Sequence, residues 1–298
     1  MSRFVLQPVP GWGKDFINSR LINREHGPAI GDGHLATGQG TKMNPDFGRT
    51  ASDYSTYRQG FPEDLYELLT ELGVRFSGAK AVDLGTGTGT LARGMARRGA
   101  SVTAIDPSSA MTHEAARLDM EWGVSTHYLN TSAEKTGLES GSFDLVTSGQ
   151  SWWWFEHDPA LAEAQRILRP GGILAICSFD WIPEPGNVVE LTERLIKQHN
   201  PAWSMGGGDG QHPEFLVDLK AGGFERTRSD SRRVNTVYSK TALRGRIRAS
   251  AGIGASLEPV EVAAFDAELA RALDAFSAEE LLPIPHAVYA AVGCKLNR

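Results

Sequence analysis

The sequence has 298 residues, 41% of them hydrophobic and 22% charged, and its 36 acids outnumber its 30 Lys and Arg, so the formal net charge is −6. The apolar content is sufficient for a buried core, and the 33 glycines follow no period, which excludes collagen-like and repeat architectures. Two cysteines, Cys177 and Cys294, are too few for a disulfide framework or a structural zinc site, and no apolar run approaches the length of a membrane span.

Residues 1–45 intersperse glycines and prolines without any apolar period. Such a segment buries little, so we expect a loosely ordered N-terminal extension over 1–45 and the folded domain over 46–298. The first regular element is a helix that begins near Pro62 and ends at Gly73, because four leucines in between recur at helical spacing.

Strands and helices then alternate. The predicted strands cover residues 79–84, 101–106, 126–129, 142–148 and 172–178, with helices over 90–99 and 158–168. Strands that alternate with helices of this length predict right-handed βαβ units and a parallel sheet covered on both faces.

The regular alternation of predicted strands and helices ends after Asp180. Residues 181–213 are rich in Pro and Gly around one predicted helix, 188–199, and we expect this insertion to cap the sheet. Beyond it the sequence predicts a helix leading into a strand near 214–224, a basic stretch at 244–248, an amphipathic helix near 262–276 and a final strand over 286–296.

The most informative stretch is VDLGTGTGTLARG, residues 82–94, followed by AIDPSSAM at 104–111. Gly85, Gly87 and Gly89 stand between a predicted strand and a predicted helix, where they allow a tight turn and close approach of a ligand. Asp106 ends the next strand, at the distance from the glycines where an acid accepts both hydroxyls of a ribose. The combination predicts a site for a nucleoside cofactor.

The spacing bears on which cofactor binds. A dinucleotide motif, G-x-G-x-x-G, requires a glycine at position 90, which is Thr90. Asp83 precedes Gly85 by two residues, and an acid there suits a cationic ammonium better than a pyrophosphate. This pattern resembles motif I of class I S-adenosylmethionine (SAM)-dependent methyltransferases.

The resemblance covers residues 46–180 and is weaker beyond them. YSTYRQGFP (54–62), SAEKTGLESGSFDLVTSGQSWWWF (132–155) and ALAEAQRILRPGGILAI (160–176) are similar to the ubiquinone/menaquinone-methyltransferase-like group (methyltransferase type 11) and its trans-aconitate-methyltransferase-like relatives. The resemblance implies a Rossmann-like α/β fold with a seven-stranded, mostly parallel sheet, helices on both faces and a C-terminal helical cap. It also implies SAM as cofactor and a small-molecule acceptor of the methyl group.

By this likeness, twelve residues bind the cofactor. Asp83, Gly85 and Gly87 line its methionine end, Asp106 takes the ribose and Met111 packs on the adenine. Tyr57 covers the methionine moiety, Ser132 and Ala133 meet the adenine edge, and Ser148 and Gln150 line the site after the fourth strand. The full set is Tyr57, Asp83, Gly85, Thr86, Gly87, Gly89, Asp106, Met111, Ser132, Ala133, Ser148 and Gln150.

The chain departs from the relatives at two positions. Ser132 stands where many carry Asp, which leaves adenine N6 to the backbone, and Trp153 stands where they often carry a histidine. Trp152, Trp153 and Trp154 either pack in the core or form an aromatic wall that shapes the substrate pocket.

Catalytic and substrate residues are less well marked. His157 is the nearest candidate general base, against the alternative of a surface histidine at a helix start. Arg244, Arg246 and Arg248 either clamp an anionic substrate or form a solvated basic face, and Trp153 and Arg248 are the candidate substrate contacts.

Two other functions remain open from the sequence: a SAM-binding regulatory protein without catalysis, and an NAD-type oxidoreductase, which Asp83 and Thr90 disfavour. Nucleic acid is not expected as a partner, because the chain is acidic and carries no appended binding module. We expect a cytoplasmic protein that has no membrane partner and no metal.

Overall fold

Strand β1 (Lys80–Leu84) lies inside a seven-stranded sheet in the computed structural model, which describes residues 57 and 60–296. The strand order is β3-β2-β1-β4-β5-β7-β6, and β1 to β5 pair in parallel whereas β7 is antiparallel to both of its neighbours. The other strands are β2 (Ser101–Ile105), β3 (His127–Leu129), β4 (Phe143–Gly149), β5 (Leu168–Trp181), β6 (Glu225–Ser239) and β7 (Leu281–Cys294). The predicted extension over 1–45 lies outside the described residues.

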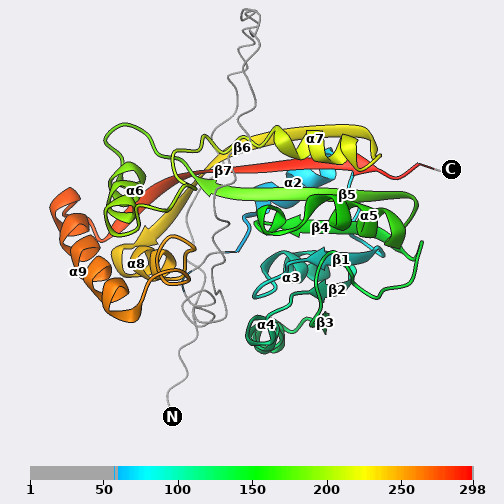
Figure 1. Cartoon of the computed structure of the whole chain (residues 1–298), viewed down its shortest axis with the longest axis horizontal. Coiled ribbons are helices and arrows are strands. Elements are labelled where there is room, and N and C mark those ends of the chain that lie inside the picture. The colour runs from blue at the N-terminus through cyan, green and yellow to red at the C-terminus, as the bar shows by residue number, and fades with distance from the viewer. Residues whose placement is uncertain (1–56, 58–59, 297–298) are drawn as a thin grey trace, which may run out of the picture. The chain divides into compact units, whose positions relative to one another are not determined.

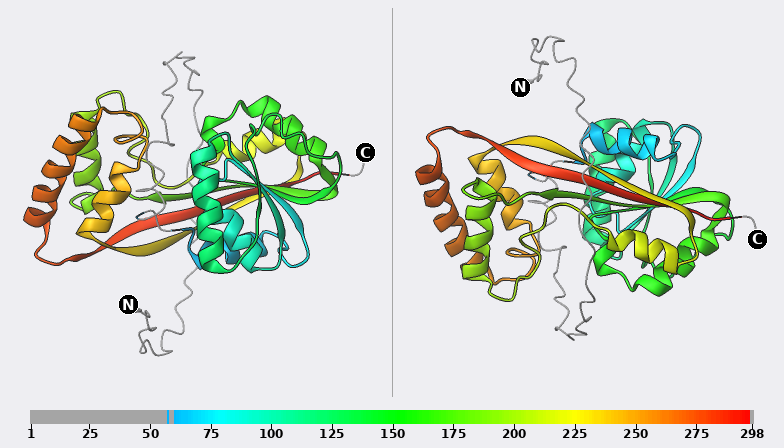
Figure 2. Two further views of the ribbon diagram at one scale, coloured as in Figure 1. Left: turned by 90° about the horizontal axis from the view of Figure 1, so that it is seen from below. Right: turned by 90° about the horizontal axis from the view of Figure 1, so that it is seen from above.

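Helices cover both faces of this sheet (Figures 1 and 2). In the described part of the chain the helices are α2 (Glu63–Glu71), α3 (Thr90–Arg97), α4 (Ser109–Trp122), α5 (His157–Ile167), α6 (Val188–His199), α7 (Glu214–Ala221), α8 (Lys240–Arg248) and α9 (Pro259–Phe276), and the 3-10 turn η2 covers Trp152–Trp154.

The alternation of side chains along the strands separates two apolar cores. In β1, Ala81 belongs to the core that includes leucines of α2 and α3, whereas Val82 and Leu84 belong to the core beneath α5 and α7. Successive residues of a strand point to opposite faces, so the continuous burial of residues 81–84 in β1 reflects cover on both sides of the sheet. The predicted doubly covered, mostly parallel sheet is confirmed.

A third apolar core lies between α6, α8 and α9, which we call the cap helices. Figure 1 shows them together at one end of the long strands β5, β6 and β7, away from α3, α4 and α5. Val189, Ile247 and Phe265 contribute to this core from the three helices and are almost fully buried. The basic stretch at 244–248 forms the second half of α8 and so belongs to the cap helices.

Three strands are longer than predicted, and one of them is β6, which follows the stretch 214–224 and continues to Ser239. β5 extends to Trp181, and β7 begins at Leu281 although Pro283 and Pro285 interrupt its sequence. Both prolines pair in register with β6, opposite Val237 and Asn235. The carbonyl of Pro285 accepts from the N–H of Ile182, so the N and C=O of these residues face the β5 side. The last partner of β7 on β5 is His286, opposite Trp181, and the prolines therefore face away from the β6 ladder and lie beyond the β5 ladder. A proline is tolerated where its missing N–H removes no ladder bond, which explains why these prolines do not end the strand.

Cys177 is buried in β5 and Cys294 is half-buried at the end of β7, and both are free thiols. Within residues 57 and 60–296, every helix is too short or too polar to cross a membrane.

Candidate functional site

The glycine-rich turn joins the end of β1 to the start of α3. Gly85 and Gly87 have positive φ angles of 65° and 55°, a backbone region that favours glycine. A Cβ on Gly85 would lie 2.6 Å from the Cβ of Ser151, so this glycine is also required for packing. A Cβ on Gly87 would meet nothing within 4 Å, and the turn is therefore open to a ligand at Gly87.

Asp106 follows β2 and is half-buried beside that turn. Its Oδ2 accepts a hydrogen bond from the backbone N–H of Gly87 at 2.8 Å, and its Oδ1 accepts one from the N–H of Ser108 at 2.9 Å. Burial raises the pKa of this carboxyl, and the two N–H donors oppose the rise. The donors fix the orientation of the carboxylate at the end of β2.

Asp83 lies at the end of β1 and is buried. Its oxygens accept hydrogen bonds from the hydroxyls of Thr86 and Thr147, each at 2.7 Å. Burial raises the pKa of Asp83 to about 6, although both hydroxyls favour the ionised form. Asp83 thus ties the turn to β4, and its contact with an ammonium group stays a prediction.

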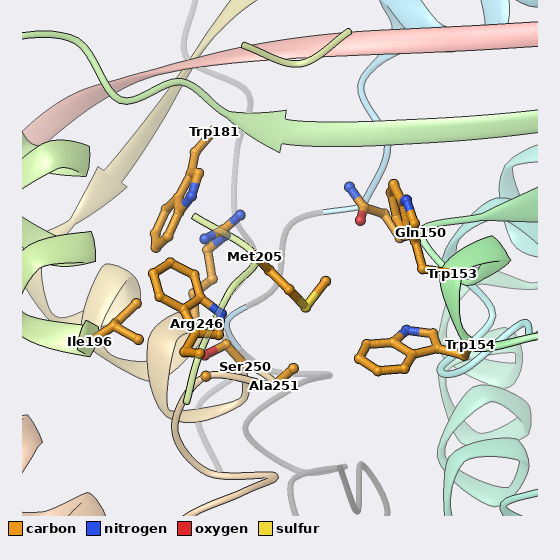
Figure 3. A pocket seen from close by; sticks show the side chains of 11 residues that line it. Gln150, Trp153, Trp154, Trp181, Ile196, Met205, Arg246, Ser250 and Ala251 are labelled. Carbon is orange, nitrogen blue, oxygen red and sulfur yellow. The ribbon is translucent and has the colours of Figure 1, made fainter. Parts of the chain in front are cut away.

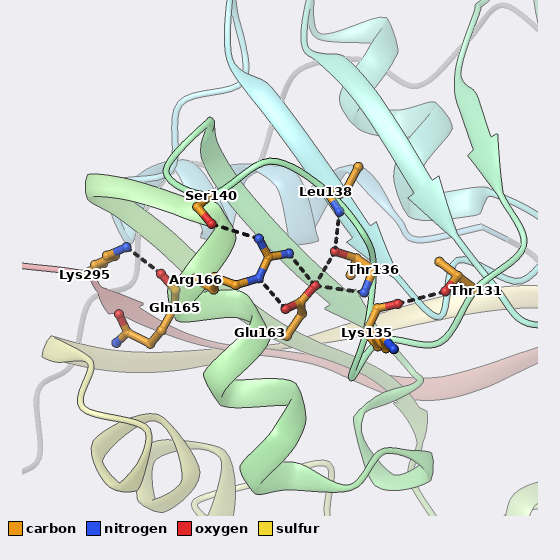
Figure 4. Close-up of polar contacts among 9 residues, drawn as sticks. All are labelled: Thr131, Lys135, Thr136, Leu138, Ser140, Glu163, Gln165, Arg166 and Lys295. Atoms are coloured by element: carbon orange, nitrogen blue, oxygen red, sulfur yellow. Dashed lines mark hydrogen bonds and ion pairs between the residues drawn. The ribbon is translucent and has the colours of Figure 1, made fainter.

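The loop between β3 and β4 carries Ser132 and Ala133 and is fastened to α5 (Figure 4). Glu163 accepts a 2.8 Å hydrogen bond from the N–H of Thr136 and pairs with Arg166 at 2.7 Å. The hydrogen bonds from Arg166 and Thr136 hold the pKa of Glu163 at about 2. The charged anchor therefore fixes the loop in one position.

This end of the sheet combines an oriented carboxylate with apolar side chains. Asp106 carries the carboxylate, and Met111 and Ala133 are buried. Their contacts with a ribose and a base stay predictions. The open space at Gly87 leaves room for the chain of the ligand. Asp83 and Asp106 make the site acidic, which suits an ammonium-bearing nucleoside such as SAM better than a pyrophosphate.

A pocket of about 130 Å³ opens beyond the end of β4 (Figure 3). Gln150, Trp153 and Trp154 line it from the sheet, and residues of the cap helices and their connections line it from the opposite side. The described lining residues are Gln150, Trp153, Trp154, Trp181, Ile196, Trp203, Met205, Arg246, Ser250, Ala251 and Gly252.

The three consecutive tryptophans have different surroundings. Trp152 is 1% exposed and donates from Nε1 to an oxygen of Asp218 at 2.8 Å. Trp153 and Trp154 are half-buried and line the pocket. The three residues form the 3-10 turn η2, in which successive side chains point in different directions. Trp152 therefore packs in the core, and Trp153 and Trp154 form part of the pocket wall.

Gln150, in the pocket wall, belongs to a hydrogen-bonded network of polar side chains. Gln150 donates to Asp180 at 3.0 Å, and His212 contacts Asp180 through Nε2 at 2.8 Å and Glu214 through Nδ1 at 2.9 Å. Burial disfavours the charged form of His212, but the two carboxylates outweigh it and raise its pKa. Burial likewise opposes ionisation of Asp180, but the hydrogen bonds of His212 and Gln150 keep its pKa below the usual value.

Other residues singled out in the sequence lie elsewhere. His157 pairs with Asp218 at 3.1 Å and stacks on Trp152, and it is not among the described lining residues. Ser148 is fully buried, with its Oγ 2.8 Å from that of Ser151. The ring of Tyr57 lies against Gly245 of α8.

The arginines of α8 divide between two faces. Arg244 and Arg248 both pair with Asp266 of α9, at 2.5 and 3.0 Å, whereas Arg246 lines the pocket. Arg248 is thus ion-paired with Asp266 and is not among the described lining residues, and its contact with a substrate stays a prediction. Trp181 ends β5, and Trp203 and Met205 lie in the connection after α6. They also line the pocket but belong to no motif of the sequence.

Comparison with known proteins agrees with this geometry. Residues 82–176 match the model of a methyltransferase domain family. The chain is 30% identical over 198 residues to an uncharacterized methyltransferase of Mycobacterium tuberculosis, covering 60% of this chain and 76% of that protein. It is 30% identical over 214 residues to the malonyl-[acyl-carrier protein] O-methyltransferase of Salmonella typhimurium, covering 70% and 78%.

The fold is shared with solved structures as well. A candidate type II methyltransferase from Anaeromyxobacter dehalogenans superposes with a TM-score of 0.58 at 24% identity, over 82% of this chain and all of that one.

Proposed function

The chain belongs to the SAM-dependent methyltransferases, and from this membership we propose that it methylates a small molecule held in the pocket beside Gln150. Bound SAM supplies a methyl group on a positively charged sulfur, which is a good leaving group without acid assistance. The work left to the chain is to bind the cofactor, hold the acceptor in line and exclude water.

We assign the cofactor to the carboxyl ends of β1, β2 and β4. Asp106 accepts the ribose hydroxyls, while Met111 and Ala133 contact the adenine. The turn containing Gly87 approaches the methionine part, at the position where the structure leaves open space. Gln150 then separates this site from the pocket, because it follows β4 directly and lines the pocket wall.

The observation that carries the small-molecule proposal is the pocket itself. It lies between the end of β4 and the cap helices, and about 130 Å³ holds a small group and not a duplex or a folded surface. The Salmonella relative methylates malonyl-[acyl-carrier protein] by its name, a small acid presented on a carrier. A net charge of −6 further disfavours nucleic acid as acceptor.

The proposal is tested with SAM that carries a labelled methyl group. The full chain is incubated with metabolite, protein and RNA fractions of a cell extract, and Asp106→Ala serves as the matched control. We expect label in the metabolite fraction with the wild-type chain and much less with the variant. Label that enters only RNA, or only protein in a form that cleavage of carrier thioesters does not release, contradicts the proposal.

A further inference from the structure

The walls of the pocket combine aromatic rings with a positively charged side chain. Four indoles line it, from Trp153, Trp154, Trp181 and Trp203. Among the described lining residues, Arg246 is the single ionisable side chain. A site of this composition favours a ligand that stacks and that is neutral or negatively charged.

The size of the pocket suits a single ring. Its volume is about 130 Å³, and a protein cavity of roughly 150 Å³ lined by apolar side chains binds benzene. Figure 3 shows Trp154 and Trp181 on opposite sides of the space, with Met205 between the two sides. A flat ring therefore finds aromatic faces and a thioether within the same pocket.

The guanidinium of Arg246 is positioned by stacking. Its Cζ lies 4.5 Å from the ring centroid of Trp181. A guanidinium stacked in this way keeps its N–H donors in its own plane, where they match the two oxygens of a carboxylate. Trp181 is held in turn by its Nε1–H, which donates to Glu193 at 3.0 Å. The positive group is thus built into the wall.

A second polar group lies on the same wall. The Oγ of Ser250 is buried and has no hydrogen-bond partner among the described residues. A buried hydroxyl without a partner costs free energy, so a ligand oxygen that accepts its hydrogen bond stabilises the complex. Figure 3 shows Ser250 beside Arg246, on the side of the pocket opposite Gln150.

We infer that the acceptor is a planar aromatic acid, with its ring among the indoles and its carboxylate at Arg246 and Ser250. The inference rests on the proposed function, because it names the acceptor for the same pocket. It also orients the ligand: the carboxylate anchors at the cap helices, and the opposite edge of the ring faces Gln150 at the end of β4.

The test uses three probes that share one ring and differ in charge: benzoate, benzamide and protonated benzylamine. Their affinities for the full chain are measured by calorimetry with saturating S-adenosylhomocysteine. We expect benzoate to bind most tightly and benzylamine most weakly. Arg246→Gln should weaken benzoate about 10-fold or more and benzamide by a clearly smaller factor, because the ion pair is lost only with the anion, whereas the Gln side chain can still donate a hydrogen bond to the amide carbonyl.

Further variants separate this effect from damage to the fold. Ser250→Ala should weaken benzoate by several fold, and Arg246→Lys should keep the preference for benzoate over benzylamine because the charge remains. Arg271→Gln removes one positive charge from the exposed side of α9 and should change none of the three affinities. Melting temperatures identify any variant that does not fold, and Ser250→Ala then carries the test.

Three results overturn the inference: no binding of benzoate at millimolar concentration, equal affinities for benzoate and benzylamine, or an equal loss in Arg246→Gln and Arg271→Gln. The heat of S-adenosylhomocysteine binding is recorded in the same samples. If it is normal while the preference for the anion is absent, the inference fails and the proposed function stands. If it is absent, the assignment of the cofactor site fails.

Discussion

The backbone N–H of Gly87 donates a hydrogen bond to the carboxylate of Asp106 at 2.8 Å, which joins the glycine-rich turn after β1 to the end of β2. The bond means that the acid assigned to the ribose also holds the turn assigned to the methionine end. Since Asp106 takes a second N–H from Ser108 at 2.9 Å, its carboxylate is oriented before any ligand arrives. Preorganisation of this kind lowers the cost of binding.

Replacing Asp106 tests that relationship. In Asp106→Ala the N–H groups of Gly87 and Ser108 lose their acceptor, and the ribose hydroxyls lose theirs. We expect at least 10-fold weaker binding of SAM, since each hydrogen bond to a charged group contributes roughly 1.5–3 kcal/mol. Calorimetry measures the affinity, and Asp230→Ala on the exposed surface of β6 is the control. An affinity for SAM within twofold of wild type rules out the ribose assignment.

The raised pKa of Asp83 predicts a specific pH dependence of stability. Because the folded state shifts this pKa from 3.8 to about 6, it favours the protonated carboxyl. The stabilisation is complete below about pH 4 and is lost as the pH rises through 6, by about 3 kcal/mol for a shift of about two units.

Urea denaturation of wild type and Asp83→Asn between about pH 4 and pH 7 checks this dependence. The unfolding free energy of wild type should fall relative to that of Asp83→Asn over this range, because Asn does not titrate. The carboxyl of Asp106 titrates in both proteins, so its own contribution largely cancels, and its charge adds a smaller part to the raised pKa of Asp83. Parallel curves would falsify the assignment of a buried, weakly acidic carboxyl to Asp83.

Trp152 and Trp153 form a matched pair, since they are neighbours in sequence with different surroundings. Trp152→Ala removes a fully buried indole and should lower the unfolding free energy by about 3–5 kcal/mol. Trp153→Ala opens the pocket wall and should cost less stability while it lowers benzoate binding and turnover. Denaturation and product formation per folded molecule are compared in one preparation. The pocket assignment fails if Trp153→Ala is as unstable as Trp152→Ala and keeps full turnover.

The contacts of His212 predict a second pH effect. Asp180 and Glu214 raise its pKa above 6.5, so its charged form stabilises the fold below about pH 6.5 and this contribution is lost as the pH rises through the folded-state pKa. We expect His212→Gln to be about 2 kcal/mol less stable than wild type near pH 6 and closer to it near pH 9. A difference that grows with pH contradicts the ion pair.

The sequence predicts the glycine-rich turn and its surroundings well, because the information for them is local. The turn from Gly85 to Gly89, the helix after it and the acid at the end of β2 all lie within about 25 residues, so periodicity and turn chemistry identify them. The mostly parallel sheet follows from the same alternation, and the structure confirms it.

The pocket side depends on contacts between distant segments. Arg244 and Arg248 lie four residues apart and share one face of α8, whereas Arg246 lies on the other face. Asp266 of α9 pairs with Arg244 and Arg248 and so decides which face of α8 meets the pocket. The spacing of residues within α8 does not predict where Asp266 lies. The length of β7 also depends on distant contacts, since the pairing with β6 overrides the local effect of Pro283 and Pro285.

The measurement that tests the central claim most directly is the melting temperature of the full chain with S-adenosylhomocysteine and, separately, with NAD. A ligand that binds only the folded state at 100 times its dissociation constant stabilises it by about 2.7 kcal/mol. The account predicts a clear rise in melting temperature with S-adenosylhomocysteine and none with NAD. A rise with NAD and none with S-adenosylhomocysteine would contradict it.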